Sequence, residues 1–135
     1  MNSTIIPTLN CLRIWQQKIN KLRVAQEDLI NSDMYKNYNL VLLQEPYIDS
    51  FGNTKATKDW QVMYPSHHLT TDSPVHSVIL VNAALDTNSW AQHSIPGSNG
   101  LMAIQFRGDM GIIDVYNIYN DCLNDDTMDM LDLHL

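Results

Sequence analysis

The chain is poor in cysteine and in long apolar runs. Its two cysteines, Cys11 and Cys122, are more simply explained as free thiols in a reducing compartment than as a disulfide. Residues 1–8 contain no basic region typical of a signal peptide, and no apolar run reaches the length of a membrane span. We therefore expect an intracellular protein, nuclear or cytoplasmic, with no membrane partner.

Basic residues are also scarce. Lysine and arginine together number 8, against 15 aspartates and glutamates, which gives a formal net charge of -7 at pH 7. A field of this sign repels nucleic acid and phosphate substrates. A polyanion would need a bound cation or a local basic patch, and Lys18, Lys21 and Arg23 form such a cluster early in the chain. We expect nucleic acid to bind only weakly.

The composition is that of one soluble globular domain. The chain has 135 residues, of which 44% are hydrophobic and 17% are charged. This length supports one hydrophobic core and is too short for two. We therefore expect a single domain over residues 1–135.

The clearest pattern is an apolar strand that ends in an acid. Residues 40–43 are four apolar residues in a row, typical of a strand buried on both faces, and Gln44 and Glu45 follow. Pro46 has no backbone donor and so ends the strand's hydrogen bonding. A carboxylate at the end of a buried strand suits a hard cation or a reacting group. A solvated acid with no further role is the alternative interpretation.

A β-α-β unit surrounds this strand. Residues 12–17 alternate as a half-buried strand does, and Asn20 is a plausible N-cap for a helix that follows. The two strands should then be parallel neighbours with a right-handed crossover. Further strands are predicted at residues 60–64, 77–82, 101–107 and 111–119, the last two as a hairpin, with a short helix at 127–132. Residues 83–100 show little periodicity.

Four short motifs carry a resemblance to a known family. They are Arg13-Ile14-Trp15-Gln16-Gln17-Lys18-Ile19-Asn20-Lys21, Leu42-Leu43-Gln44-Glu45-Pro46-Tyr47, Ser77-Val78-Ile79-Leu80-Val81-Asn82 and Tyr116-Asn117-Ile118-Tyr119-Asn120. In order and spacing they resemble the first half of the endonuclease/exonuclease/phosphatase superfamily. The closest likeness is to the apurinic-endonuclease-like nuclease domain of LINE-type non-LTR retrotransposons, over residues 12–135.

The resemblance implies a fold and a chemistry. The fold would be part of a DNase I-like four-layer α/β sandwich, here mainly one mixed β-sheet flanked by helices. The chemistry would be Mg²⁺-dependent cleavage of a phosphodiester. Glu45 would bind the metal, Tyr119 would donate its hydroxyl toward the phosphate, and Asn20 is a secondary catalytic candidate. Tyr119 also fits a residue at the edge of the core.

Lys18 stands where the family's first motif has an asparagine. Its ammonium can pair with Glu45 and compete with a cation, whereas an amide would only orient ligands. A lysine can also bind the phosphate directly. The sequence leaves both interpretations open.

The family's later motifs, Gly-Asp-x-Asn and Ser-Asp-His, come after the point where these 135 residues stop. Residues 108–111, Gly-Asp-Met-Gly, are better interpreted as a hairpin turn, and His67 and His68 as loop residues. Hydrolysis needs a general base or an activated water, together with charge neutralisation. We therefore expect an incomplete domain that is inactive or weakly active.

Two other hypotheses stay open. An active phosphodiesterase could complete its site with a second chain, which would make activity depend on concentration. Alternatively, the chain is a non-enzymatic interaction domain. Half of a two-sheet core should leave a broad apolar sheet face and unpaired strand edges, which favour self-association or partner binding.

Overall fold

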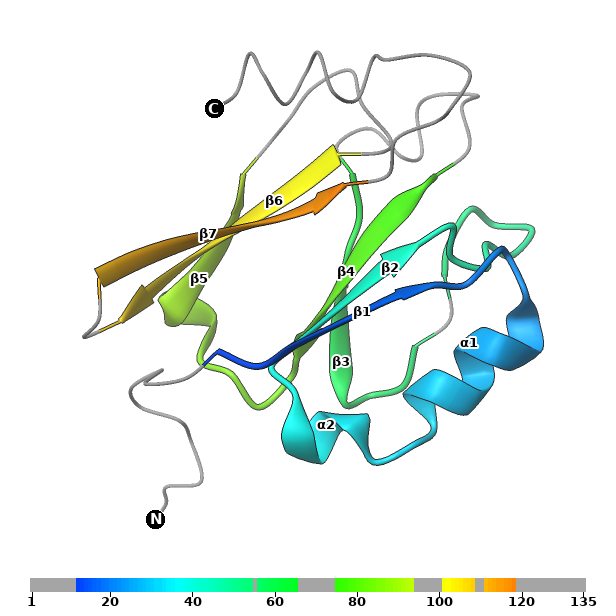
Figure 1. Cartoon of the computed structure of the whole chain (residues 1–135), viewed down its shortest axis with the longest axis horizontal. Coiled ribbons are helices and arrows are strands. Elements are labelled where there is room, and N and C mark those ends of the chain that lie inside the picture. Colours follow the sequence, from blue (N-terminus) through cyan, green and yellow to red (C-terminus); the bar gives the residue numbers. More distant parts are fainter. Residues whose placement is uncertain (1–11, 55, 66–74, 94–100, 109–110, 119–135) are drawn as a thin grey trace.

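The structure is a computed structural model, and it describes residues 12–54, 56–65, 75–93, 101–108 and 111–118. The elements are β1 (Ile14–Lys18), α1 (Arg23–Ile30), α2 (Met34–Asn37), β2 (Leu40–Gln44), β3 (Trp60–Met63), β4 (Ser77–Asn82), the 3-10 helix η1 (Thr87–Ser89), β5 (Trp90–His93), β6 (Leu101–Gly108) and β7 (Gly111–Ile118). Within these ranges, no helix has the length and apolar character that a membrane span requires. The described elements are mostly strands, with few helices, so the fold is mixed α/β (Figure 1).

The strands form two separate sheets. The larger sheet has the order β1-β2-β4-β3, and the smaller has the order β5-β6-β7. β1 and β2 are parallel neighbours, as the β-α-β pattern predicts, and β6 and β7 pair as the predicted antiparallel hairpin. The expectation of mainly one mixed sheet is wrong, because β6 pairs with β5 and β7 and packs against the larger sheet instead of extending it.

The two sheets bury a shared core. Leu42 of β2 and Ile79 of β4 lie in one cluster with Ile104 and Phe106 of β6 and Val115 of β7. The opposite face of the larger sheet packs on α1, since Ile30 shares a second cluster with β2 and β4. The described residues thus form three layers: helices, the larger sheet and the smaller sheet (Figure 1).

This packing corrects the expected open sheet face. Within the described ranges, the two inner faces cover each other and α1 covers the outer face of the larger sheet. The exposed apolar residues near the larger sheet's edge lie instead on β1, where Ile14 is 39% and Trp15 is 37% exposed. β1 is exposed because it is the terminal strand of its sheet.

Two local predictions are also wrong. Asn20 does not cap α1: the N-cap is Leu22, which has an extended backbone and makes no side-chain capping hydrogen bond. Asn20 instead lies in a left-handed turn between β1 and α1. The sequence pattern also missed β5, a four-residue strand without clear alternation, which is defined by its ladder with β6. The predicted helix at residues 127–132, His67 and His68 lie outside the described residues.

Candidate functional site

Three unusual backbone conformations gather at one edge of the larger sheet. Because β1 and β2 are parallel, their carboxyl ends meet at the same edge. Asn20, Lys21 and Glu45 follow these ends and have φ angles of 57°, 61° and 48°. They are the only non-glycine residues with positive φ in the part of the chain that the structure describes. Such conformations are costly and tend to cluster at functional sites.

The Glu45 backbone is held from two sides. Its N–H donates to the carbonyl of His76, just before β4, at 2.8 Å. Its carbonyl accepts the N–H of Lys21, in the turn after β1, also at 2.8 Å. Pro46 then follows and is buried. The acid therefore occupies the end of the strand, as the sequence predicts, on a backbone with little freedom.

Lys18 contacts the Glu45 carboxylate. Its Nζ lies 3.6 Å from Oε2 of Glu45, and the two side chains are 57% and 20% exposed. The register of the parallel strands explains the contact, because Lys18 pairs with Gln44, the residue before Glu45. The competing pair that the sequence suggested is therefore present.

The Lys18 ammonium disfavours a Mg²⁺ ion at the Glu45 carboxylate. The ion prefers hard oxygen ligands and is repelled by a nearby ammonium. The Glu45 carboxylate contacts such an ammonium. One protein carboxylate is nevertheless enough for a Mg²⁺ ion that takes its other ligands from water and phosphate. Metal binding by Glu45 therefore stays a prediction.

Asn117 is a site residue that sequence reasoning missed. It is fully buried, and its Nδ2 donates to the carbonyls of Leu43 at 3.1 Å and of Val78 at 2.8 Å. Its Oδ1 accepts a hydrogen bond from Nε2 of Gln44. The sequence feature that could have identified it is its spacing: Asn117 follows Ile113 and Val115 at every second position of β7, and these two residues face the core. Asn117 ties the end of β7 to β2 and β4.

This tie places the end of β7 beside the end of β2. We call the edge formed by the turn after β1, Glu45 and the end of β7 the rim. Tyr119 lies outside the described residues, but β7, which leads to it, ends at Ile118 next to the Asn117 contacts. Asn20 is exposed in the turn at the same edge. A catalytic role for Tyr119 and for Asn20 stays a prediction.

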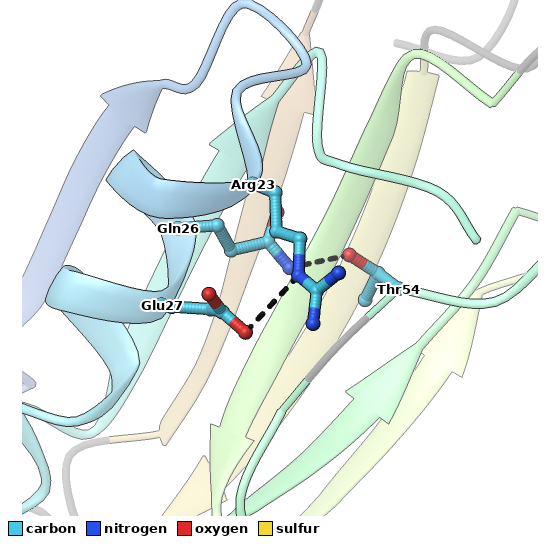
Figure 2. Close-up of polar contacts among 4 residues, drawn as sticks. All are labelled: Arg23, Gln26, Glu27 and Thr54. Atoms are coloured by element: carbon cyan, nitrogen blue, oxygen red, sulfur yellow. Dashed lines mark hydrogen bonds and ion pairs between the residues drawn. The ribbon is translucent and has the colours of Figure 1, made fainter.

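A second buried network holds the segment that follows Glu45, and Figure 2 shows its contact between Gln26 and Thr54. Gln26 of α1 is fully buried and donates from Nε2 to Oγ1 of Thr54 at 2.6 Å. Its Oε1 accepts the N–H of Tyr47 at 2.7 Å, and the Thr54 hydroxyl donates to the Tyr47 carbonyl at 2.6 Å. Figure 2 also shows the exposed Arg23–Glu27 contact of the same helix, 3.3 Å from Nε to Oε2. Helix α1 thereby fixes the chain two residues beyond Glu45.

Tyr64 extends this network. Its hydroxyl oxygen accepts the Thr54 N–H at 3.0 Å. Burial raises the pKa of the Tyr64 phenol above its ordinary value, and the nearby Asp49 carboxylate raises that pKa further, while the hydrogen bond from Thr54 opposes both. The phenol therefore keeps its proton to higher pH than a solvated tyrosine does.

A small cavity lies next to Glu45 in sequence and space. It has a volume of about 240 Å³ and is lined by Lys21, Pro46, Tyr47, Ile48 and Val75. Its wall is mainly apolar, with one cationic side chain. The rim thus combines the Glu45 acid, two lysines and an apolar hollow.

No protein-family model and no curated protein matches this sequence. A solved structure does match: the endonuclease domain of TRAS1, a telomere-specific non-LTR retrotransposon, with a TM-score of 0.72 and 17% sequence identity. The match covers 92% of this chain and 54% of that chain, so this chain spans about half of its neighbour's length. At this level of identity the likeness concerns the fold. The chain therefore has the fold of a retrotransposon endonuclease domain over about half of that domain's length.

Proposed function

We propose that this chain is part of a nuclease-like domain whose rim contacts a phosphodiester, and that the 135 residues alone do not hydrolyse it. The observation that carries the proposal is the left-handed backbone of Glu45, which is hydrogen-bonded to the backbone of Lys21 on one side and of His76 on the other. A strained acid at the carboxyl end of a strand is a typical place for a reacting group. The endonuclease fold of the structural neighbour supports the same interpretation.

The roles of the rim residues follow from their chemistry. Glu45 is the acid that would hold a metal ion, against the opposing charge of Lys18, and Tyr119 and Asn20 are candidate phosphate contacts. Lys18 and Lys21 carry positive charge at the same edge, and both are exposed. A phosphodiester can bind to such ammonium groups even though the whole chain has a net charge of -7. We expect weak binding that falls steeply with salt.

The Lys18–Glu45 contact is a reason to expect no turnover. Hydrolysis needs a base or an activated water and a means of neutralising charge, and acid–base catalysis alone is worth about 10²–10⁴-fold in rate. In the described ranges, the Glu45 carboxylate is in contact with an ammonium and lies in no cluster of metal-ligating side chains. Charge neutralisation by a divalent ion is therefore weakened at this acid.

Plasmid nicking tests the proposal. Purified chain is incubated with supercoiled DNA in Mg²⁺ or EDTA, alongside the Glu45→Gln variant, across a range of protein concentrations. We expect no nicking above the blank for either protein, and weak DNA binding by fluorescence anisotropy that is lost at high salt. Mg²⁺-dependent nicking by the native chain that disappears in Glu45→Gln would overturn the claim of no turnover.

A second candidate function is a non-enzymatic interaction domain. The observation in its favour is the edge strand β1, which among the described residues pairs with β2 alone. Ile14 and Trp15 of this strand are exposed. An exposed edge strand with apolar side chains is a template for pairing with another chain.

A further inference from the structure

We infer that Lys18 acts as a built-in cation that keeps divalent metal ions away from Glu45. The inference rests on the proposed function only in taking Glu45 as the acid of the rim. It goes beyond that function because it attributes weak binding of divalent ions at Glu45 to one residue, Lys18 of the neighbouring strand β1. Replacing Lys18 by a neutral residue should therefore raise the affinity of the rim for Mg²⁺.

The contact is built into the fold. Lys18 is the last residue of β1 and lies opposite Gln44 in the parallel ladder. The N–H of Ile19 then donates to the Gln44 carbonyl at 2.9 Å, which fixes the register up to the residue before Glu45. The ammonium therefore reaches the carboxylate from an ordered backbone.

Partial burial strengthens the contact. The Glu45 side chain is 20% exposed, so water screens its charge less than it screens a surface carboxylate. The two partners lie at the ends of two paired strands, β1 and β2, and the sheet maintains the relative position of those ends. A divalent ion at Glu45 would have to displace this ammonium or bind beside it, against its positive charge.

The structure contains a matched control pair. Lys36 Nζ lies 3.7 Å from Oδ1 of Asp33 at α2, and the Lys36 side chain is 58% exposed, close to the 57% of Lys18. Replacing either lysine by asparagine changes the net charge by the same amount. The two pairs differ in the acid, since the Asp33 side chain is 74% exposed. A general effect of charge on metal binding would therefore appear in both variants.

Calorimetric titration with MgCl₂, and thermal unfolding with and without Mg²⁺, test the inference without any substrate. We expect the Lys18→Asn variant to bind Mg²⁺ up to about fivefold more tightly than the native chain, since an ion pair with an exposed lysine contributes at most about 1 kcal/mol. Lys36→Asn should behave as the native chain does. The double variant Lys18→Asn with Glu45→Gln should lose the gain.

Three results would overturn the inference: native chain that binds Mg²⁺ as tightly as Lys18→Asn, an equal gain in Lys36→Asn, or a gain that survives in the double variant. Circular dichroism checks the fold, and Lys18→Gln, which keeps more of the aliphatic stem, serves if Lys18→Asn does not fold. Because binding is measured without DNA, its outcome is separate from that of the nicking assay. The native chain could nick DNA, against the proposed function, while Lys18→Asn still binds Mg²⁺ more tightly. Equally, the native chain could fail to nick DNA while Lys18→Asn shows no gain in Mg²⁺ binding.

Discussion

At the scale of single residues, a buried asparagine organises the rim. Asn117 makes three hydrogen bonds to β2 and β4 from a position with no solvent exposure. The sequence placed it in a strand motif and gave no sign that its amide would bridge two sheets. Its partners Leu43 and Val78 are distant in sequence, and two of its hydrogen bonds go to their carbonyls. Backbone partners leave no trace in a sequence pattern.

We predict that Asn117→Ala lowers the free energy of unfolding by about 2–4 kcal/mol, because it leaves two buried carbonyls and the Gln44 amide without this partner. Urea unfolding followed by fluorescence measures the change. Asn88→Ala, at an exposed position of η1, is the control and should shift stability by less than about 0.5 kcal/mol. Equal effects of the two substitutions would contradict a bridging role for Asn117.

At the scale of elements, α1 connects the core to the segment behind the candidate acid. The sequence pattern predicts its helix from Leu22, Ala25, Leu29 and Ile30, and Ile30 is buried as expected. Leu22 is 58% exposed, however, and the fully buried polar residue is Gln26. Helical periodicity finds the helix but not this inward-facing amide, because the amide's partners Tyr47 and Thr54 come from a loop.

We predict that Gln26→Ala lowers the free energy of unfolding by about 2–3 kcal/mol, since the Tyr47 N–H and the Thr54 hydroxyl lose a buried partner. Arg23→Ala in the same helix removes an exposed pair and should cost less than about 0.5 kcal/mol. Chemical denaturation gives both values. Faster hydrogen exchange at the Tyr47 amide in Gln26→Ala alone would show that α1 holds this segment, and unchanged exchange would argue against it.

At the scale of the whole molecule, the edge strand decides whether copies of the chain associate. Native chain should increase in mass with concentration in light scattering, because among the described residues β1 pairs only with β2 and carries the exposed Ile14. Ile14→Lys should abolish the increase, since a lysine on an edge strand opposes pairing. Val24→Lys, at a residue that is 68% exposed on α1 and away from any strand edge, should leave it unchanged. A native chain that stays monomeric at every concentration would remove the case for association through β1.

Local sequence patterns are enough to predict every described strand except β5. The apolar run of β2 and the run of β4 have the predicted bounds, and the hairpin of β6 and β7 forms as predicted. These features follow from neighbouring residues, whose periodicity expresses which side faces the core. The position of Glu45 just after the end of β2 is likewise predicted from neighbouring residues.

The division of the strands into two sheets, the meeting of the left-handed residues and the choice between the two roles of Lys18 depend on the tertiary structure. Each of these depends on pairs far apart in the chain: β6 with β4, Asn117 with Leu43, and Lys18 with Glu45. Strand pairing and side-chain contact are set by competition among all such pairs for burial and hydrogen bonds. A local pattern contains no record of that competition.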